Sequence, residues 1–136
     1  MSEPSDPDGT VPPALELALR AIAMPADANP NGDIFGGWLL SQMDLAGGTV
    51  AMRRAGGRVA TVAITGMSFR RPVFVGDEVS CYAEIVKTGA TSLTLKVESW
   101  ARRGLGGEPV KVTEGVFTYV AVSPDRRPRP IPPDKK

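Results

Sequence analysis

Histidine is absent from this 136-residue chain, and cysteine occurs once, as Cys81. Without histidine there is no Ser-His-Asp or Cys-His catalytic machinery and no histidine-based metal site. A single cysteine excludes an internal disulfide bond and a cysteine-rich zinc site, and this usage fits a reducing cytosol. We therefore expect a cytoplasmic protein without a metal ion or other cofactor.

Strong charge and long apolar runs are also absent. The formal net charge of +1 argues against a dedicated nucleic-acid-binding protein, although a local basic cluster would suffice for a small anionic ligand. No run approaches the roughly 18 apolar residues of a membrane span, and the acidic, proline-containing residues 1–13 do not resemble a signal peptide. With 42% hydrophobic residues, the length suits one domain with a substantial core.

The composition changes along the chain and predicts three parts. Residues 1–13 and 123–136 are rich in proline and charged side chains and are expected to be flexible tails around a domain at 14–122. The first apolar stretch fits either a strand at 15–24 or a short helix at 14–23, and periodicity alone does not decide between them. Residues 25–37, rich in Pro, Asn, Asp and Gly, are expected to form a loop.

A helix is expected at 38–55, stopped by Gly56-Gly57. At 100° per residue, its apolar face contains Leu39, Leu40, Met43, Gly47, Val50 and Ala51. Gly47 and Gly48 should each cost the helix about 1 kcal/mol relative to alanine. A helix that keeps both glycines is expected to have another group pressed closely against it.

Beyond the helix, apolar residues recur at every second position. This pattern predicts strands near 60–65, 79–85, 92–98 and 110–122, separated by turn signals at 72–77, 88–90 and 104–107. A lone amphipathic helix followed by half-polar strands should lie across one face of an antiparallel sheet, which is an α+β fold. Cys81 alternates with apolar neighbours and is interpreted as a small core residue, not a nucleophile.

Several segments resemble the YciA-type acyl-CoA thioesterase family. They are DANPNGDIFGGW at 27–38 with SQMD at 41–44 and the glycine pair at 47–48, TGMSFRRPV at 65–73, VGD at 75–77, and FTYVAV at 117–122. The resemblance covers about residues 21–133 and implies a hotdog fold, in which a curved antiparallel sheet wraps a long central helix. It also implies homodimers with active sites between subunits, assembly as a trimer of dimers, and hydrolysis of acyl-CoA to a free fatty acid and coenzyme A.

Thioester hydrolysis requires an aligned water, an acceptor for its proton, and donors for the developing oxyanion. In a chain without histidine the acceptor must be a carboxylate. Asp44 is the best candidate, because partial burial at the edge of the helix's apolar face disfavours the charged form and strengthens the base. The resemblance gives the acidic residue at this position a catalytic role, whereas the alternative is a rim carboxylate that pairs with an arginine.

The loop before the helix contains the other catalytic candidates. Gly36 and Gly37 stand just before the helix, where free N–H groups can bind the thioester oxygen. The alternative is that the two glycines only form an ordinary glycine-rich entry to the helix. Asn29 occupies the position of an asparagine that the resemblance makes catalytic, yet asparagine before Pro30 is also common in turns. Asp33 is a second candidate carboxylate, although such a residue is more typical of a turn or cap.

The candidates for substrate binding carry weaker signals. Arg70 and Arg71 stand at a strand end, and arginine binds phosphate groups such as those of coenzyme A, although a lone arginine is also typical of a solvated surface. Ser68 and Thr65 can donate hydrogen bonds near the acyl group, and Phe35 can line the acyl pocket.

Two other functions were weighed against hydrolysis. A non-catalytic hotdog sensor that binds acyl-CoA usually carries a DNA-binding segment, for which residues 1–13 are too short and too acidic. A hotdog dehydratase typically uses a histidine, which this chain lacks.

Overall fold

The central element is the helix α1 (Gly36–Ala55), which begins two residues earlier than expected, so that Gly36 and Gly37 form its first turn. Its buried residues are Leu39, Met43, Ala46, Gly47, Val50, Ala51 and Ala55. The predicted apolar face is thus confirmed, except that Leu40 is only partly buried. Gly56 ends the helix in the left-handed conformation, with φ 73°, as expected for a glycine stop.

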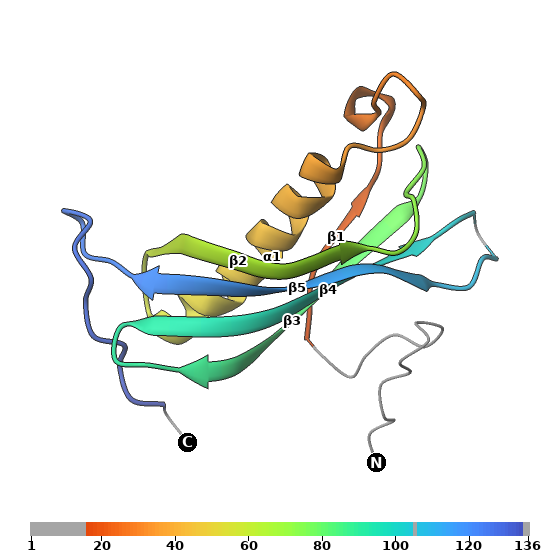
Figure 1. Ribbon diagram of the computed structural model, residues 1–136. Helices are drawn as coiled ribbons and strands as arrows, with labels where there is room; N and C mark the ends of the chain where they lie inside the picture. The colour runs from red at the N-terminus through yellow and green to blue at the C-terminus, as the bar shows by residue number, and fades with distance from the viewer. Residues whose placement is uncertain (1–15, 105, 135–136) are drawn as a thin grey trace, which may run out of the picture.

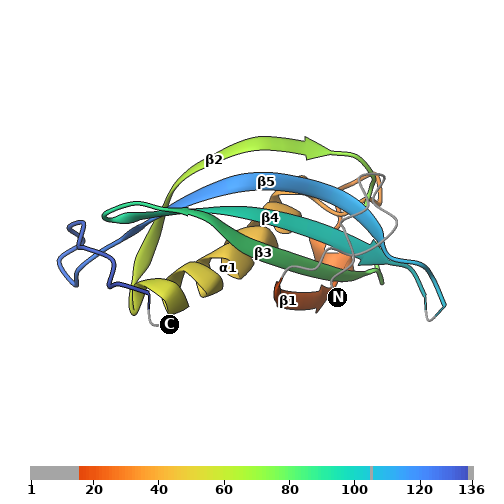
Figure 2. The ribbon, with the colours of Figure 1, turned by 90° about the horizontal axis from the view of Figure 1, so that it is seen from below.

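Five strands form one antiparallel sheet in the order β1-β3-β4-β5-β2. They are β1 (Glu16–Ile22), β2 (Val59–Phe69), β3 (Glu78–Thr88), β4 (Ser92–Arg102) and β5 (Val110–Ala121). The first segment, left undecided by its periodicity, is therefore a strand, and the other four strands lie where they were predicted. They do not form a simple meander, because β2 pairs with β5 at the edge of the sheet and not with β3, the next strand in sequence. The sheet arches over α1, which lies across its concave side (Figures 1 and 2). The expected α+β class, with a curved sheet around one long helix, is confirmed.

The middle of α1 approaches the sheet closely at Gly47. A Cβ atom on this residue would lie 2.5 Å from Tyr119 Oη and 3.1 Å from Val97 Cγ2, so a side chain there would displace its neighbours. A Cβ on Gly48 would lie 3.7 Å from the same tyrosine ring, which is an ordinary contact. The prediction that a group presses against the glycine pair is confirmed, and that group is the phenol of Tyr119 on β5.

The computed structural model describes residues 16–104 and 106–134. The predicted tail at 1–13 lies outside these residues. At the other end, residues 123–134, for which the composition predicts a flexible tail, contact the domain at Arg129 and Ile131. Arg129 holds this segment, since Nη1 donates to Ala55 O at the end of α1 (3.0 Å) and Nε donates to Val122 O (3.1 Å).

The edge strand β2 carries apolar side chains in solvent. Val62 is 57% exposed and Phe69 54% exposed, and Leu45 on α1 is 58% exposed. β2 pairs with β5 on one side and has no strand on its other side among the described residues. An edge with unpaired N–H and C=O groups and apolar side chains is a template for pairing with another chain.

Candidate active site

The carboxylate of Asp44 lies midway along α1 and meets two hydroxyl groups from the sheet. Oδ1 accepts hydrogen bonds from Thr61 Oγ1 (2.8 Å) and Tyr119 Oη (3.0 Å), and the phenol also lies 3.0 Å from the backbone oxygen of Asp44. Within the described residues, no donor contacts Oδ2 and no arginine or lysine forms an ion pair with this carboxylate. Asp44 is partly buried and is not the arginine-paired rim residue that was the alternative.

Thr61 and Tyr119 occupy directly opposite positions on β2 and β5, so both side chains project to the same face of the sheet. Burial raises the pKa of Tyr119 well above its ordinary value, and the negative charge of Asp44 raises it further. The phenol is therefore a neutral donor. Sequence reasoning missed this pair, although a tyrosine at an inward strand position needs a partner for its hydroxyl. The Gly47-Gly48 pair, one turn beyond Asp44, marked where such a ring approaches the helix.

A second group of predicted residues surrounds a pocket of about 250 Å³ at the N-terminal end of α1, called here the loop pocket. Its lining includes Asn29, Asp33, Phe35, Gly36 and Arg71. Asn29 Oδ1 accepts hydrogen bonds from the backbone N–H groups of Asn31 (2.9 Å) and Asp33 (3.1 Å). The oxygen of Asn29 therefore has the turn role that was the alternative, while its amide NH₂ group makes no contact with a protein acceptor in the described chain.

The N-terminal end of α1 has no side-chain cap, and Phe35 occupies the N-cap position. The first N–H groups of the helix belong to Gly36 and Gly37, which are both exposed. A Cβ on Gly37 would meet nothing within 4 Å, and one on Gly36 would meet only the ring of Phe69, at 3.5 Å. Uncapped N–H groups at the positive end of a helix dipole can bind a carbonyl oxygen or an anion.

The two predicted halves of the site do not converge in a single protomer. Asp44 is absent from the lining of the loop pocket. Along α1, Gly37 and Asp44 are seven residues apart, which corresponds to roughly 10 Å at the helical rise per residue. An oxyanion donor and a base that serve one carbonyl group each lie about 3 Å from the reacting atoms.

Of the two predicted arginines, only Arg71 lies at the loop pocket. Its Nη1 donates to the backbone oxygen of Lys111 (2.8 Å), which orients the guanidinium. Arg70 instead lies near Glu114, with 3.7 Å between Nη2 and Oε2, and its side chain is 41% exposed.

Thr65 and Ser68 lie on β2 on either side of Gly66, which has φ 69°. The pairing of β2 with β5 shifts register in this stretch. Both residues are exposed, and neither lines the loop pocket or contacts Asp44. The protomer therefore does not bring these two hydroxyl groups together with the other candidates.

Sequence reasoning also missed an ion pair between a buried carboxylate and an exposed guanidinium, which lies beside the loop pocket. Asp77 is 1% exposed and accepts hydrogen bonds from Arg103 (Nε, 3.1 Å, and Nη2, 3.2 Å) and from the N–H of Phe74 (2.9 Å). The guanidinium also lies 4.2 Å from the centre of the Phe74 ring, and its hydrogen bond to Asp77 raises the pKa of Arg103. The clamp fixes the turn before β3, next to Val73, whose carbonyl accepts the N–H of Ile34 (2.9 Å).

Comparison with known proteins identifies the family. Residues 31–107 match the model of the thioesterase superfamily. The acyl-CoA thioester hydrolase YciA of Salmonella typhimurium is 55% identical over 124 residues, which are 88% of this chain and 92% of that protein. This chain belongs to the YciA family of acyl-CoA thioester hydrolases. The family expected from the sequence motifs is confirmed.

Solved structures agree with this membership of the YciA family. The hexameric thioesterase y2039 from Yersinia pestis superimposes with a TM-score of 0.85 at 52% identity, covering 89% of this chain and 99% of that chain. The hexameric hotdog-fold thioesterase Cj0915 of Campylobacter jejuni superimposes with a TM-score of 0.81 at 43% identity, covering 86% of this chain and 90% of that chain. The hotdog fold is therefore confirmed.

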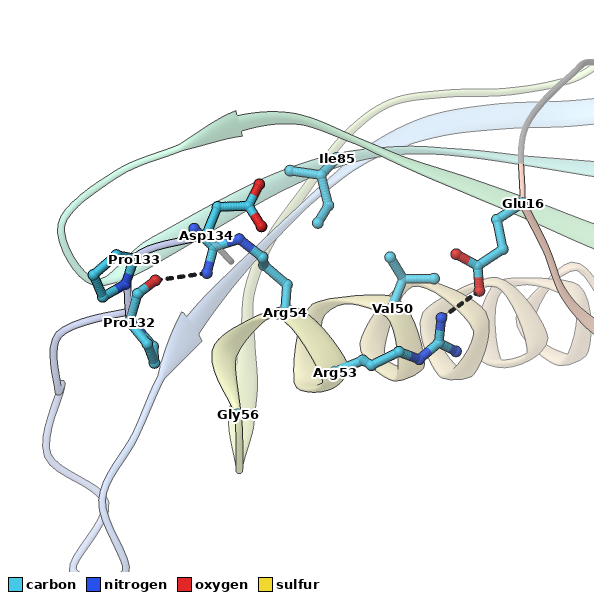
Figure 3. Close-up of a pocket in the computed structure, with 9 residues that line it drawn as sticks. All are labelled: Glu16, Val50, Arg53, Arg54, Gly56, Ile85, Pro132, Pro133 and Asp134. Carbon is cyan, nitrogen blue, oxygen red and sulfur yellow. Dashed lines mark hydrogen bonds and ion pairs between the residues drawn. The ribbon is translucent and has the colours of Figure 1, made fainter. Parts of the chain in front are cut away.

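A larger cavity, of about 570 Å³, lies at the other end of α1, between the helix, β3 and the C-terminal segment (Figure 3). The predicted catalytic residues do not line it, although Arg53 and Arg54, two further basic residues considered for the phosphates of coenzyme A, do. Its arginines are engaged in holding the fold, because Arg53 Nη1 contacts Glu16 Oε2 (2.6 Å) and Arg54 Nη1 donates to Pro132 O (2.7 Å). We interpret it as space between packed segments, not as the site of the reaction.

Cys81 is fully buried, and burial raises the pKa of its thiol to about 12, so it is a core residue and not a nucleophile, as predicted. In the ranges 16–104 and 106–134, no group of three or more His, Cys, Asp or Glu side chains is placed to hold a metal ion. Nor is any described helix both long and apolar enough to cross a membrane.

Proposed function

We propose that this protein hydrolyses acyl-CoA with Asp44 as the general base. The observation that carries the proposal is the carboxylate geometry: hydroxyl donors occupy Oδ1, while Oδ2 has no donor among the described residues. A water hydrogen-bonded to Oδ2 attacks the thioester carbon and passes a proton to Oδ2. The tetrahedral intermediate then collapses, the C–S bond breaks, and coenzyme A leaves as a thiolate that takes the proton.

The loop pocket supplies the remaining groups of the proposed site. The N–H groups of Gly36 and Gly37 stabilise the oxyanion, because they are uncapped and lie at the positive end of α1. The amide NH₂ group of Asn29 orients the thioester carbonyl or the attacking water, while its oxygen maintains the turn. Phe35 contacts the acyl chain.

Coenzyme A is bound mainly through its phosphate groups. Arg71 at the loop pocket is the first candidate for these contacts, and Arg70 next to it in sequence is the second. Thr65 and Ser68 on the exposed edge strand are placed to donate hydrogen bonds to a substrate held against β2.

We place each complete site between two copies of the chain. The separation of Asp44 from the loop pocket in one protomer supports this arrangement, because a partner copy can bring its own loop pocket to Asp44. The open edge of β2 and its exposed apolar side chains support a homodimer. The hexameric relatives from Yersinia pestis and Campylobacter jejuni support a trimer of such dimers. The buried lone cysteine agrees with a cytoplasmic protein.

The proposal is tested by incubating the protein with acyl-CoA esters of short to long chain and measuring release of free thiol. Asp44→Asn keeps the shape of the side chain but removes the base, so kcat should fall by about 10²–10⁴-fold. Asp33→Asn, the variant of the other candidate carboxylate, should retain turnover. Full turnover by Asp44→Asn would disprove the assignment of the base, and tight acyl-CoA binding without any thiol release would indicate a non-catalytic acyl-CoA sensor.

A further inference from the structure

The hydrogen bonds at Asp44 are distributed unevenly between its two carboxylate oxygens. Thr61 Oγ1 and Tyr119 Oη both donate to Oδ1, and the donors come from two neighbouring strands in direct register. In the described chain Oδ2 receives no donor. The two oxygens of this carboxylate therefore have different surroundings, although they are chemically equivalent in a free aspartate.

This asymmetry restricts rotation of the carboxylate. The terminal torsion of an aspartate is soft, so an unrestrained carboxylate samples a broad range of orientations and exchanges its two oxygens. Two donors on one oxygen hold that torsion and use the lone pairs of Oδ1. The backbone carbonyl of Asp44, which also lies 3.0 Å from Tyr119 Oη, ties the phenol to the helix at the same place.

We propose that Thr61 and Tyr119 are positioning residues that hold Oδ1 of Asp44, so that Oδ2 alone faces the water and receives its proton. The inference rests on the proposed function, in which Asp44 is the base. Preorganisation of a reacting group by hydrogen bonds from a rigid neighbour is a general way to keep its geometry productive. Here the rigid neighbours are a cross-strand pair, and Gly47 provides the room that the phenol needs.

Loss of either donor should therefore free the carboxylate to turn, so that Oδ2 no longer faces the water consistently. No described lysine or arginine lies within ion-pair distance of Asp44, so Thr61 on β2 and Tyr119 on β5 are the groups that hold it. The expected result is a lower kcat with little change in KM, because substrate binding does not depend on this torsion.

Thr61 provides the sharper test, since its side chain is exposed and the strand tolerates a β-branched replacement. Thr61→Val keeps the shape and removes the hydroxyl group, whereas Thr61→Ser keeps the hydroxyl group. We measure kcat and KM for one acyl-CoA ester. Thr61→Val should lower kcat on the order of tenfold and leave KM within about twofold. Thr61→Ser should restore kcat.

Tyr119→Phe should lower kcat in the same way, with little change in KM. Thr118→Val is a matched control, because Thr118 is the next residue on β5 and projects to the opposite face of the sheet. Thr118→Val should have the kcat and KM of the wild type. Thermal unfolding of each variant separates a loss of fold from a loss of positioning. If Tyr119→Phe does not fold, the two Thr61 variants still decide whether the positioning role is correct.

The outcomes separate this inference from the proposed function. If Asp44→Asn is inactive but Thr61→Val and Thr61→Ser have the same kcat, the positioning role is disproved and the base assignment stands. A loss confined to KM in Thr61→Val would also overturn it. If the wild type releases no thiol, or if Asp44→Asn keeps full turnover, both the proposed function and this inference are wrong.

Discussion

The surroundings of Asp44 and the loop pocket differ in what their polar groups are used for. In the loop pocket, the side-chain oxygen of Asn29 and the guanidinium of Arg71 form hydrogen bonds with the backbone, so they maintain the local structure as well as facing the pocket. At Asp44, both protein donors bind the side chain itself. The loop pocket is therefore organised to hold a loop and a ligand, whereas the surroundings of Asp44 are organised to orient one carboxylate.

The difference between the loop pocket and Asp44 explains why one continuous stretch of sequence contains two kinds of functional residue. Residues 27–38 and Asp44 are close in sequence, but a straight helix carries Asp44 roughly 10 Å from the loop. The loop is organised by local turns, whereas Asp44 depends on strands that come 17 and 75 residues later. Substitutions in the two regions should therefore fail in different ways.

Among substitutions other than those of Asp44 itself, the largest effect should come from Gly47→Ala. The added methyl group would lie 2.5 Å from Tyr119 Oη, so the phenol must move away from Asp44 or the helix must shift. Such overpacking should cost roughly 1–3 kcal/mol of unfolding free energy, and loss of a held base should lower kcat by about 100-fold. Thermal unfolding and thiol release measure the two effects.

Gly48→Ala is the control for Gly47→Ala. Its methyl group would make only an ordinary contact with the ring of Tyr119, at 3.7 Å, and alanine favours the helix by about 1 kcal/mol over glycine. This variant should be at least as stable as the wild type and fully active. Equal behaviour of the two alanine variants would show that the close approach at Gly47 has no role.

Sequence reasoning predicted the helix, the four later strands and the glycine contact because each depends on local periodicity or on a local cost. Leu39, Met43 and Val50 follow the helical period, and Gly47 and Gly48 are unfavourable in a helix unless a neighbour requires them.

Sequence reasoning did not predict the strand order, in which β2 pairs with β5, because the pairing of distant strands is not a local property. It did not predict the roles of Thr61 and Tyr119 either, because their contact with Asp44 depends on the register of two distant strands. The clamp of Asp77 and Arg103 was missed for the same reason, since it joins residues that are 26 positions apart. The contact of Arg129 with the end of α1 was missed in the same way, because it joins residues that are 74 positions apart, whereas the prediction of a C-terminal tail rests on composition alone.

An intermediate effect is expected at Asn29, where two variants separate its two roles. Asn29→Asp keeps an oxygen that accepts the N–H groups of Asn31 and Asp33 but removes the amide donor. It should lower kcat by about tenfold with an unchanged melting temperature. Asn29→Ala should lower both, because the turn also loses its acceptor. Wild-type turnover in Asn29→Asp would mean that this residue serves the turn alone.

The smallest effect is expected at Arg71 and should appear in binding. Arg71→Gln removes a charge at the loop pocket, so KM for acyl-CoA should rise by roughly three- to tenfold while kcat stays constant. The rise should shrink at high salt, because the contact is electrostatic. Arg70→Gln, outside the pocket and near Glu114, should raise KM less. A fall in kcat with unchanged KM would place Arg71 in the chemistry and weaken the contrast between the two regions.

The burial of Cys81 has a practical consequence for work with this protein. It is the only cysteine in the chain, and its thiol is inaccessible and protonated in the native state. A chromogenic disulfide reagent added to a reaction mixture therefore colours only with the liberated coenzyme A, without a background signal from the native protein. In denaturant the same reagent should gain one equivalent of colour per chain, so a single dye reports both turnover and the integrity of the preparation.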